Sequence, residues 1–129
     1  MAAMCAVLLG QPSAAQEWTE YTNRVDRFMV PAPGAPTVET IRWESEYGAT
    51  FPGRVYAWTQ GRNRYSVTVV DYTDAERIHA QVDHIAYRGG PGYWTIDIMA
   101  SIDYAATRYR QKPGVTVTYD AWNYIERKR

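Results

Sequence analysis

Residues 54–71, R-V-Y-A-W-T-Q-G-R-N-R-Y-S-V-T-V-V-D, decide the fold of this chain. Aromatic and β-branched residues alternate with polar ones on both sides of residues 60–63, and such residues suit the pleated surface of a β-strand. The Gly and Asn of residues 60–63 tolerate positive φ angles, so this segment is predicted to be the loop of a β-hairpin. An isolated hairpin is only marginally stable in water, so other segments have to cover it or extend it.

Residues 38–47 carry the clearest strand pattern outside the hairpin. Ile41 and Trp43 alternate with Arg42 and Glu44, which is the pattern of a strand with one buried and one exposed face. Residues 48–53 form a loop before the hairpin. The sequence therefore predicts a three-stranded antiparallel meander made of strands 38–47, 54–60 and 64–71.

Two shorter strands are predicted before the meander, at residues 17–22 and 27–30, with a turn between them. Residues 31–36 follow, and proline stands at 31, 33 and 36. Because proline has no N–H to donate to a ladder, we expect this segment to be an extended connector.

The hydrophobic period changes after residue 72. Residues 73–76, T-D-A-E, have the form of a capping box, with Thr73 as the N-cap and Glu76 reaching back to it. Apolar residues then recur at helical spacing as far as Ala86, and residues 89–92, G-G-P-G, end the pattern. A first helix is therefore predicted between these two signals.

A second helix is predicted from about Trp94 to Arg110. Its apolar stripe is expected to pack on one face of the sheet and consists of Ile98, Ile102, Ala105 and Tyr109. Residues 115–126 return to strand alternation, and the chain ends at Arg129 with no turn after them. We expect this last strand to be a sheet edge open to pairing with a partner, or the chain to be truncated there.

These elements predict an α+β fold. A mainly antiparallel sheet of about five or six strands carries two helices packed on one face. The length suits a single domain, which we assign to residues 16–129.

Residues 1–15 are predicted to be a signal peptide whose basic n-region is missing. Residues 2–10 are apolar, and Ser13-Ala14-Ala15 resembles a signal-peptidase site that leaves Gln16 as the first mature residue. The apolar run is too short to cross a bilayer. The missing basic residue indicates a true start upstream of Met1. We expect a periplasmic protein without disulfides, because the single cysteine, Cys5, lies inside the leader.

The charge balance argues against a nucleic-acid binder, since 14 basic residues face 14 acidic ones and such proteins usually carry a basic excess. Aromatic residues are biased toward 11 Tyr and 5 Trp, with 2 Phe. That bias suits half-exposed sheet faces, and it also suits a stacking surface for a ligand.

Arginines gather around the central hairpin at Arg54, Arg62 and Arg64, with Tyr65 next to the loop. Guanidinium groups bind carboxylates and phosphates in a bidentate way, so these residues are candidates for binding a protein partner or an anionic ligand. Charges on a sheet edge also prevent aggregation between sheets, and that alternative stays open.

No catalytic motif stands out. The alternative to a binding protein is a small periplasmic hydrolase or metal-dependent enzyme that uses His79, Asp83 or His84. The two histidines are five residues apart and cannot share one metal as an i, i+4 pair would. We expect them on a solvated helix face, and we predict no cofactor and no metal site.

The start of the mature chain resembles PsbP/Mog1-like domains, in particular exported proteins of proteobacteria. The residues that carry the resemblance are Trp18-x-x-Tyr21, Asp26-x-Phe28-x-Val30 and Pro33-Gly34-x-Pro36. The resemblance implies an antiparallel sheet between helices and a protein that binds or scaffolds. This chain departs from the family in its two consecutive helices and in its early end. We therefore expect a non-enzymatic accessory or binding protein of the bacterial envelope.

Overall fold

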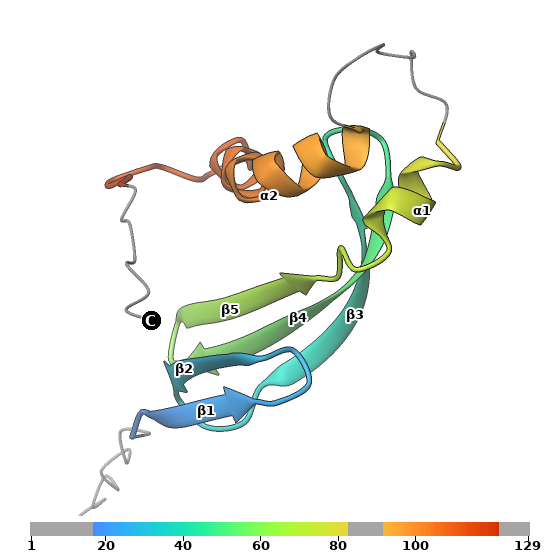
Figure 1. The fold of residues 1–129 in the computed structure, drawn as a ribbon. Coiled ribbons are helices and arrows are strands. Elements are labelled where there is room, and N and C mark those ends of the chain that lie inside the picture. Colours follow the sequence, from blue (N-terminus) through green and yellow to red (C-terminus); the bar gives the residue numbers. More distant parts are fainter. Residues whose placement is uncertain (1–16, 83–91, 122–129) are drawn as a thin grey trace, which may run out of the picture. The chain divides into compact units, whose positions relative to one another are not determined.

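The computed structural model describes residues 17–82 and 92–121, which form five strands and two helices (Figure 1). In chain order the elements are β1 (Thr19–Asn23), β2 (Phe28–Ala32), β3 (Thr37–Glu44), β4 (Thr50–Gln60), β5 (Asn63–Val70), α1 (Ala75–His79) and α2 (Tyr93–Arg110). The strands make a two-stranded sheet, β1-β2, and a three-stranded sheet in the order β3-β4-β5. The predicted α+β class and the antiparallel meander are both confirmed.

The central hairpin closes with a two-residue turn of Gly61 and Arg62. Gly61 has a φ of 60°, and a glycine with positive φ at the first central position is typical of the type II′ turn that suits twisted strands. This turn sets Gln60 opposite Asn63. The same register continues beyond the strand ends, because the Asp71 N–H donates to the Pro52 carbonyl at 2.9 Å.

The strands β1 and β2 pair from Thr19 opposite Ala32 to Asn23 opposite Phe28. In the turn between them, the Asn23 side chain accepts a hydrogen bond from the Asp26 N–H at 2.8 Å. Pro31 lies inside β2, although we expected the connector to begin there. A strand in a two-stranded sheet has one unpaired edge, so a missing N–H is tolerated.

The described chain divides into two compact units. The first takes residues up to 40 together with 54–69, and the second takes residues 41–53 together with those from 70 onward. The core of the first unit is Ala32, Tyr56 and Trp58, with Tyr21, Phe28, Val30, Tyr65, Val67 and Val69 packed against it. The core of the second unit is Ala49, Phe51 and Ala75, with Trp43, Val70, Tyr72, Ile78, Val82 and Trp94 packed against it.

The strand β4 changes its buried set of residues along its length. Phe51 and Gly53 are buried near its start, and Tyr56 and Trp58 are buried near its end. Consecutive side chains of a strand leave opposite faces, so odd positions serve one core and even positions the other. One inward face therefore cannot be assigned to the whole strand.

The helix α1 differs from its prediction. It begins at Ala75 after Asp74, and no side chain caps it. The capping box is wrong, because the Thr73 N–H instead donates to the Asp71 carboxylate at 2.9 Å. The helix also ends at His79, and the rest of the predicted helix from residue 83 onward lies outside the described part of the chain.

The helix α2 has the predicted bounds but buries a different face. Ile102 is 68% exposed and Tyr109 is 61% exposed, so the predicted stripe does not pack on the sheet. Asp97 is 1% exposed instead, and the Arg108 guanidinium lies 5.1 Å from the centre of the Trp43 ring. The predicted strand at 115–126 is wrong as far as residue 121, because residues 115–121 have no regular structure. Residues 122–126 lie outside the described part.

Neither α1 nor α2, the helices among the described residues, is long and apolar enough to span a bilayer.

Candidate functional site

The predicted arginine cluster separates into two groups. Arg54 lies on β4 six residues before Gln60, which is about 20 Å along a strand at about 3.3 Å per residue. Its guanidinium binds Asp26 of the β1–β2 turn through two donors, with Nε donating to Oδ2 at 2.7 Å and Nη2 donating to Oδ1. Arg54 therefore holds a turn in the first unit, and the structure does not bring it next to Arg62 and Arg64.

Asp26 accepts a third hydrogen bond, from the Tyr56 hydroxyl at 2.5 Å. The Arg54 hydrogen bonds lower the pKa of Asp26 from its ordinary value, burial opposes this, and the Tyr56 hydrogen bond adds to the lowering. The same contact raises the pKa of Tyr56. The Asp26 side chain is 5% exposed, so its charge is compensated inside the protein and is not offered to a ligand.

Arg62 and Arg64 remain at the end of the hairpin, and both are exposed. Among the ion pairs formed within the described residues, none involves either guanidinium. Arg62 stands in the turn itself, whereas Arg64 is the second residue of β5. Two positive charges without a counter-charge among the described residues therefore lie in and next to the same turn.

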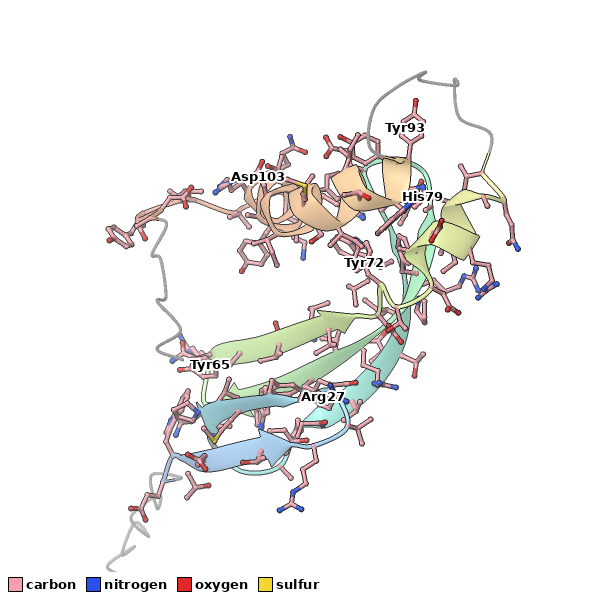
Figure 2. All side chains as sticks on the ribbon, in the orientation of Figure 1. Arg27, Tyr65, Tyr72, His79, Tyr93 and Asp103 are labelled. Carbon is pink, nitrogen blue, oxygen red and sulfur yellow. The ribbon has the colours of Figure 1, made fainter. Side chains whose placement is uncertain are left out.

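An aromatic pair lies at the same end of the hairpin. The Trp18 and Tyr65 rings meet edge to face, with centroids 4.8 Å apart and planes 86° apart. The Trp18 Nε1–H donates to the Gln60 side chain at 2.9 Å, which fixes the indole against the hairpin while leaving Trp18 41% exposed. Figure 2 shows Tyr65 at the hairpin end of β5. We call Trp18, Gln60, Arg62, Arg64 and Tyr65 the tip surface.

Sequence reasoning found three residues of the tip surface and missed two. Trp18 is 42 positions before Gln60, and no local pattern connects them. Arg64 and Tyr65 are consecutive, so their side chains leave opposite faces of β5. The tip surface therefore suits a partner that contacts both faces of the hairpin end, with Arg62 in the turn between the two faces.

His79 was expected on a solvated helix face, and this expectation is wrong. Its side chain is 4% exposed, and its Nε2 lies 2.8 Å from Oδ2 of Asp97, which is 1% exposed. The Phe51 ring lies 5.9 Å from the imidazole. The pair joins α1 to α2 in the second unit. Asp83 and His84 lie outside the described residues, and among those described no three His, Cys, Asp or Glu side chains gather to hold a metal ion.

Tyr72 lies close to this pair, and Figure 2 shows both Tyr72 and His79 next to α2. Burial raises the pKa of the Tyr72 hydroxyl and the negative charge of Asp97 adds to the rise, whereas the Trp43 side chain opposes it. Tyr72 stacks on Phe51 with centroids 4.2 Å apart. The His79–Asp97 pair is therefore buried beside the aromatic rings of Phe51 and Tyr72, which suits a structural contact better than contact with a substrate.

Comparison of the chain with protein-family models, with curated protein sequences and with solved structures finds no match. The resemblance to PsbP/Mog1-like domains therefore rests on the sequence pattern of residues 18–36 alone.

Proposed function

We propose that this chain is an exported, non-enzymatic accessory or binding protein of the bacterial envelope, of PsbP/Mog1-like type, and that it holds an anionic protein partner on the tip surface. The observation that carries the proposal is that Arg62 and Arg64 are exposed and form no ion pair within the described residues, at the same end of the hairpin as the anchored Trp18–Tyr65 pair. The predicted signal peptide at residues 1–15 supports the envelope location.

The contrast with Arg54 supports a binding role for the other two arginines. Arg54 has Asp26 as its partner, so a guanidinium that serves the fold is matched within the chain. Arg62 and Arg64 have no such carboxylate within the described residues. Arginine and aromatic residues are enriched where protein surfaces recognise partners, because they combine bidentate hydrogen bonding with a large contact area.

The buried titratable groups support the same proposal. His79 and Asp97 are the described residues closest to a catalytic pair, and both are enclosed. Their mutual hydrogen bond, together with the contact of His79 with Phe51, accounts for their positions without a substrate. The proposal therefore assigns this pair to stability and the tip surface to binding.

Capture of partners from an envelope extract tests the proposal. The full chain is immobilised, and proteins retained by the unchanged chain are compared with those retained by Arg62→Glu. Reversing the charge should abolish capture, and retained proteins should elute as the salt concentration rises, because exposed charge pairs are screened within about 10 Å at 0.1 M salt.

Arg42→Glu is the matched control, since Arg42 is also an exposed arginine but lies on β3 in the second unit. It should leave capture unchanged. Equal loss with Arg42→Glu would point to net charge alone, and full capture by Arg62→Glu would refute the proposed surface.

A further inference from the structure

The two edges of the three-stranded sheet differ in their protection. The edge strand β3 carries exposed charges at Glu39, Arg42 and Glu44, which is a common device against strand addition. The edge strand β5 is eight residues long, has no proline, and carries one charge, Arg64 near its start. Strand addition is therefore favoured at β5.

The register shows which groups of β5 face outward. Gln60 and Asn63 close the hairpin, and the Asp71 N–H bonds to Pro52 in the same register. In an antiparallel ladder alternate residues bond to the neighbouring strand, so odd-numbered residues of β5 bond to β4. The N–H and C=O groups of Arg64, Ser66 and Thr68 therefore point away from the sheet.

Residues 115–121, V-T-V-T-Y-D-A, form an exposed segment with the sequence of a strand. Val117 is 49% exposed and Tyr119 is 84% exposed. Within the described part of the chain, the backbone hydrogen bond of this segment is that of the Val115 N–H to the Lys112 carbonyl at 3.2 Å. Alternating valine, threonine and tyrosine strongly favour a strand, so this is a strand sequence without a ladder.

We propose that residues 115–121 of one copy of the chain add as an antiparallel strand to the β5 edge of a second copy. The register that sets Asp120 opposite Arg64 also sets Thr118 opposite Ser66 and Thr116 opposite Thr68. On the other face, the same register pairs two tyrosines and two sets of valines: Tyr119 with Tyr65, Val117 with Val67, and Val115 with Val69.

The complementarity is specific to this register. Opposite charges, hydroxyl pairs and aromatic pairs are the cross-strand combinations that stabilise a sheet. A shift by one residue moves every side chain of the added strand to the other face and destroys all of these matches. Asp120 at present bonds to Arg110 at 2.5 Å, and its side chain is 48% exposed. Exchange of Arg110 for Arg64 as its partner replaces one exposed ion pair with another.

The inference shares Arg64 and Tyr65 with the tip surface, but it is tested at different residues from the proposed function. Arg62 stands outside the new ladder, so charge reversal there tests partner capture and leaves the ladder groups of β5 in place. Strand addition is tested at Ser66 and Thr118, neither of which belongs to the tip surface.

Cross-linking of mixed chains tests the inference. In full chains carrying Cys5→Ser, which removes the single native cysteine, one chain receives Ser66→Cys and a second, mass-tagged chain receives Thr118→Cys. Directly opposite residues in a hydrogen-bonded antiparallel pair have Cα atoms about 5.5 Å apart, within disulfide range. After oxidation, the mixed disulfide should exceed by about tenfold that formed with Val117→Cys, whose side chain leaves the other face.

Sedimentation equilibrium of the unmodified full chain should show a concentration-dependent dimer. Thr118→Pro removes an N–H that would bond to β5 and should weaken dimerisation by about tenfold or more, whereas Thr118→Val keeps the N–H and should not. Because residue 118 lies outside both cores, neither variant should unfold the chain. A monomer at all concentrations, or a disulfide that forms within a single chain carrying both cysteines and not between chains, would overturn the inference.

Discussion

Removal of the Asp97 carboxylate should strongly destabilise the second unit. Asp97 is 1% exposed and binds the equally enclosed His79 at 2.8 Å. Asp97→Ala leaves the imidazole buried without its partner and also leaves a cavity beside α1. Breaking a buried pair in this way costs about 3–5 kcal/mol. Asp97→Asn keeps the shape and one hydrogen-bonding oxygen, so we expect a smaller cost of about 1–3 kcal/mol.

Urea unfolding followed by far-ultraviolet circular dichroism measures this loss, and tryptophan fluorescence gives a second probe. Trp43 and Trp94 both pack in the second unit, so tryptophan fluorescence should change when that unit unfolds. Asp103→Ala is the matched control, because Asp103 is an exposed aspartate on the same helix. Its free energy of unfolding should stay within about 0.5 kcal/mol of that of the unchanged chain.

A double-mutant cycle with His79→Ala separates the pair from the cavities. Residues that contact each other give a coupling energy of about 0.5–3 kcal/mol, whereas independent sites add. We expect a coupling energy near the upper end of that range. If Asp97→Ala costs less than about 1 kcal/mol, or if the two single changes simply add, then the pair does not hold α1 to α2 and the reasoning fails.

Two further predictions concern the first unit. Because the pKa of Asp26 is lower in the folded chain, its carboxylate stabilises the fold above the unfolded pKa near 3.8, and this contribution is lost as the pH falls through the lower folded pKa. Asp26→Asn should therefore make the free energy of unfolding less dependent on pH below about pH 4. An unchanged pH dependence in that range would contradict this cause. Gly61→Ala should lower the free energy of unfolding in urea by about 1–2 kcal/mol, because Gly61 has a φ of 60°. No atom lies within 4 Å of an added Cβ, so this cost comes from the backbone conformation and not from a clash. Gly61→Asn should recover part of the cost, and equal stability of all three chains would show that the turn adopts another conformation.

The strands of the hairpins were predictable because alternation and turn residues act locally. Gly61 lies in the turn that separates β4 from β5, where the sequence predicted a loop. The inward face of β4 was not predictable in the same way, since Phe51 and Trp58 belong to different cores. Alternation assigns two faces to a strand, but the elements that cover each face are distant in sequence.

The buried face of α2 was predicted wrongly for a related reason. Ile98, Ile102 and Tyr109 form the better apolar stripe, yet the helix buries the side that carries Asp97. A buried carboxylate is costly unless a charged or hydrogen-bonding partner meets it, and that partner, His79, stands 18 positions away. The start of the first helix was misplaced because the Thr73 N–H donates to the Asp71 carboxylate, and this bond competes with the capping-box pattern of Thr73 and Glu76.

The candidate site shows the same division. Arg62, Arg64 and Tyr65 adjoin the hairpin turn, and a local pattern located them. Arg54 belongs to the same cluster in the sequence, but the strand places it near the middle of β4, away from the turn, where Asp26 binds it. Trp18 joins the tip surface through a contact between distant segments, which composition and periodicity cannot show.

Residues 115–121 separate strand propensity from strand formation. Their alternation is as regular as that of β5, yet they form no ladder within the described residues. A helix satisfies its backbone hydrogen bonds within its own segment, whereas a strand depends on a neighbour whose edge is open. β5 offers such an edge with matching side chains, so residues 115–121 lack only a neighbouring strand to pair with. If strand addition occurs between copies, the strand predicted there exists only in the assembly, and the same sequence pattern is correct for a dimer and wrong for the isolated chain.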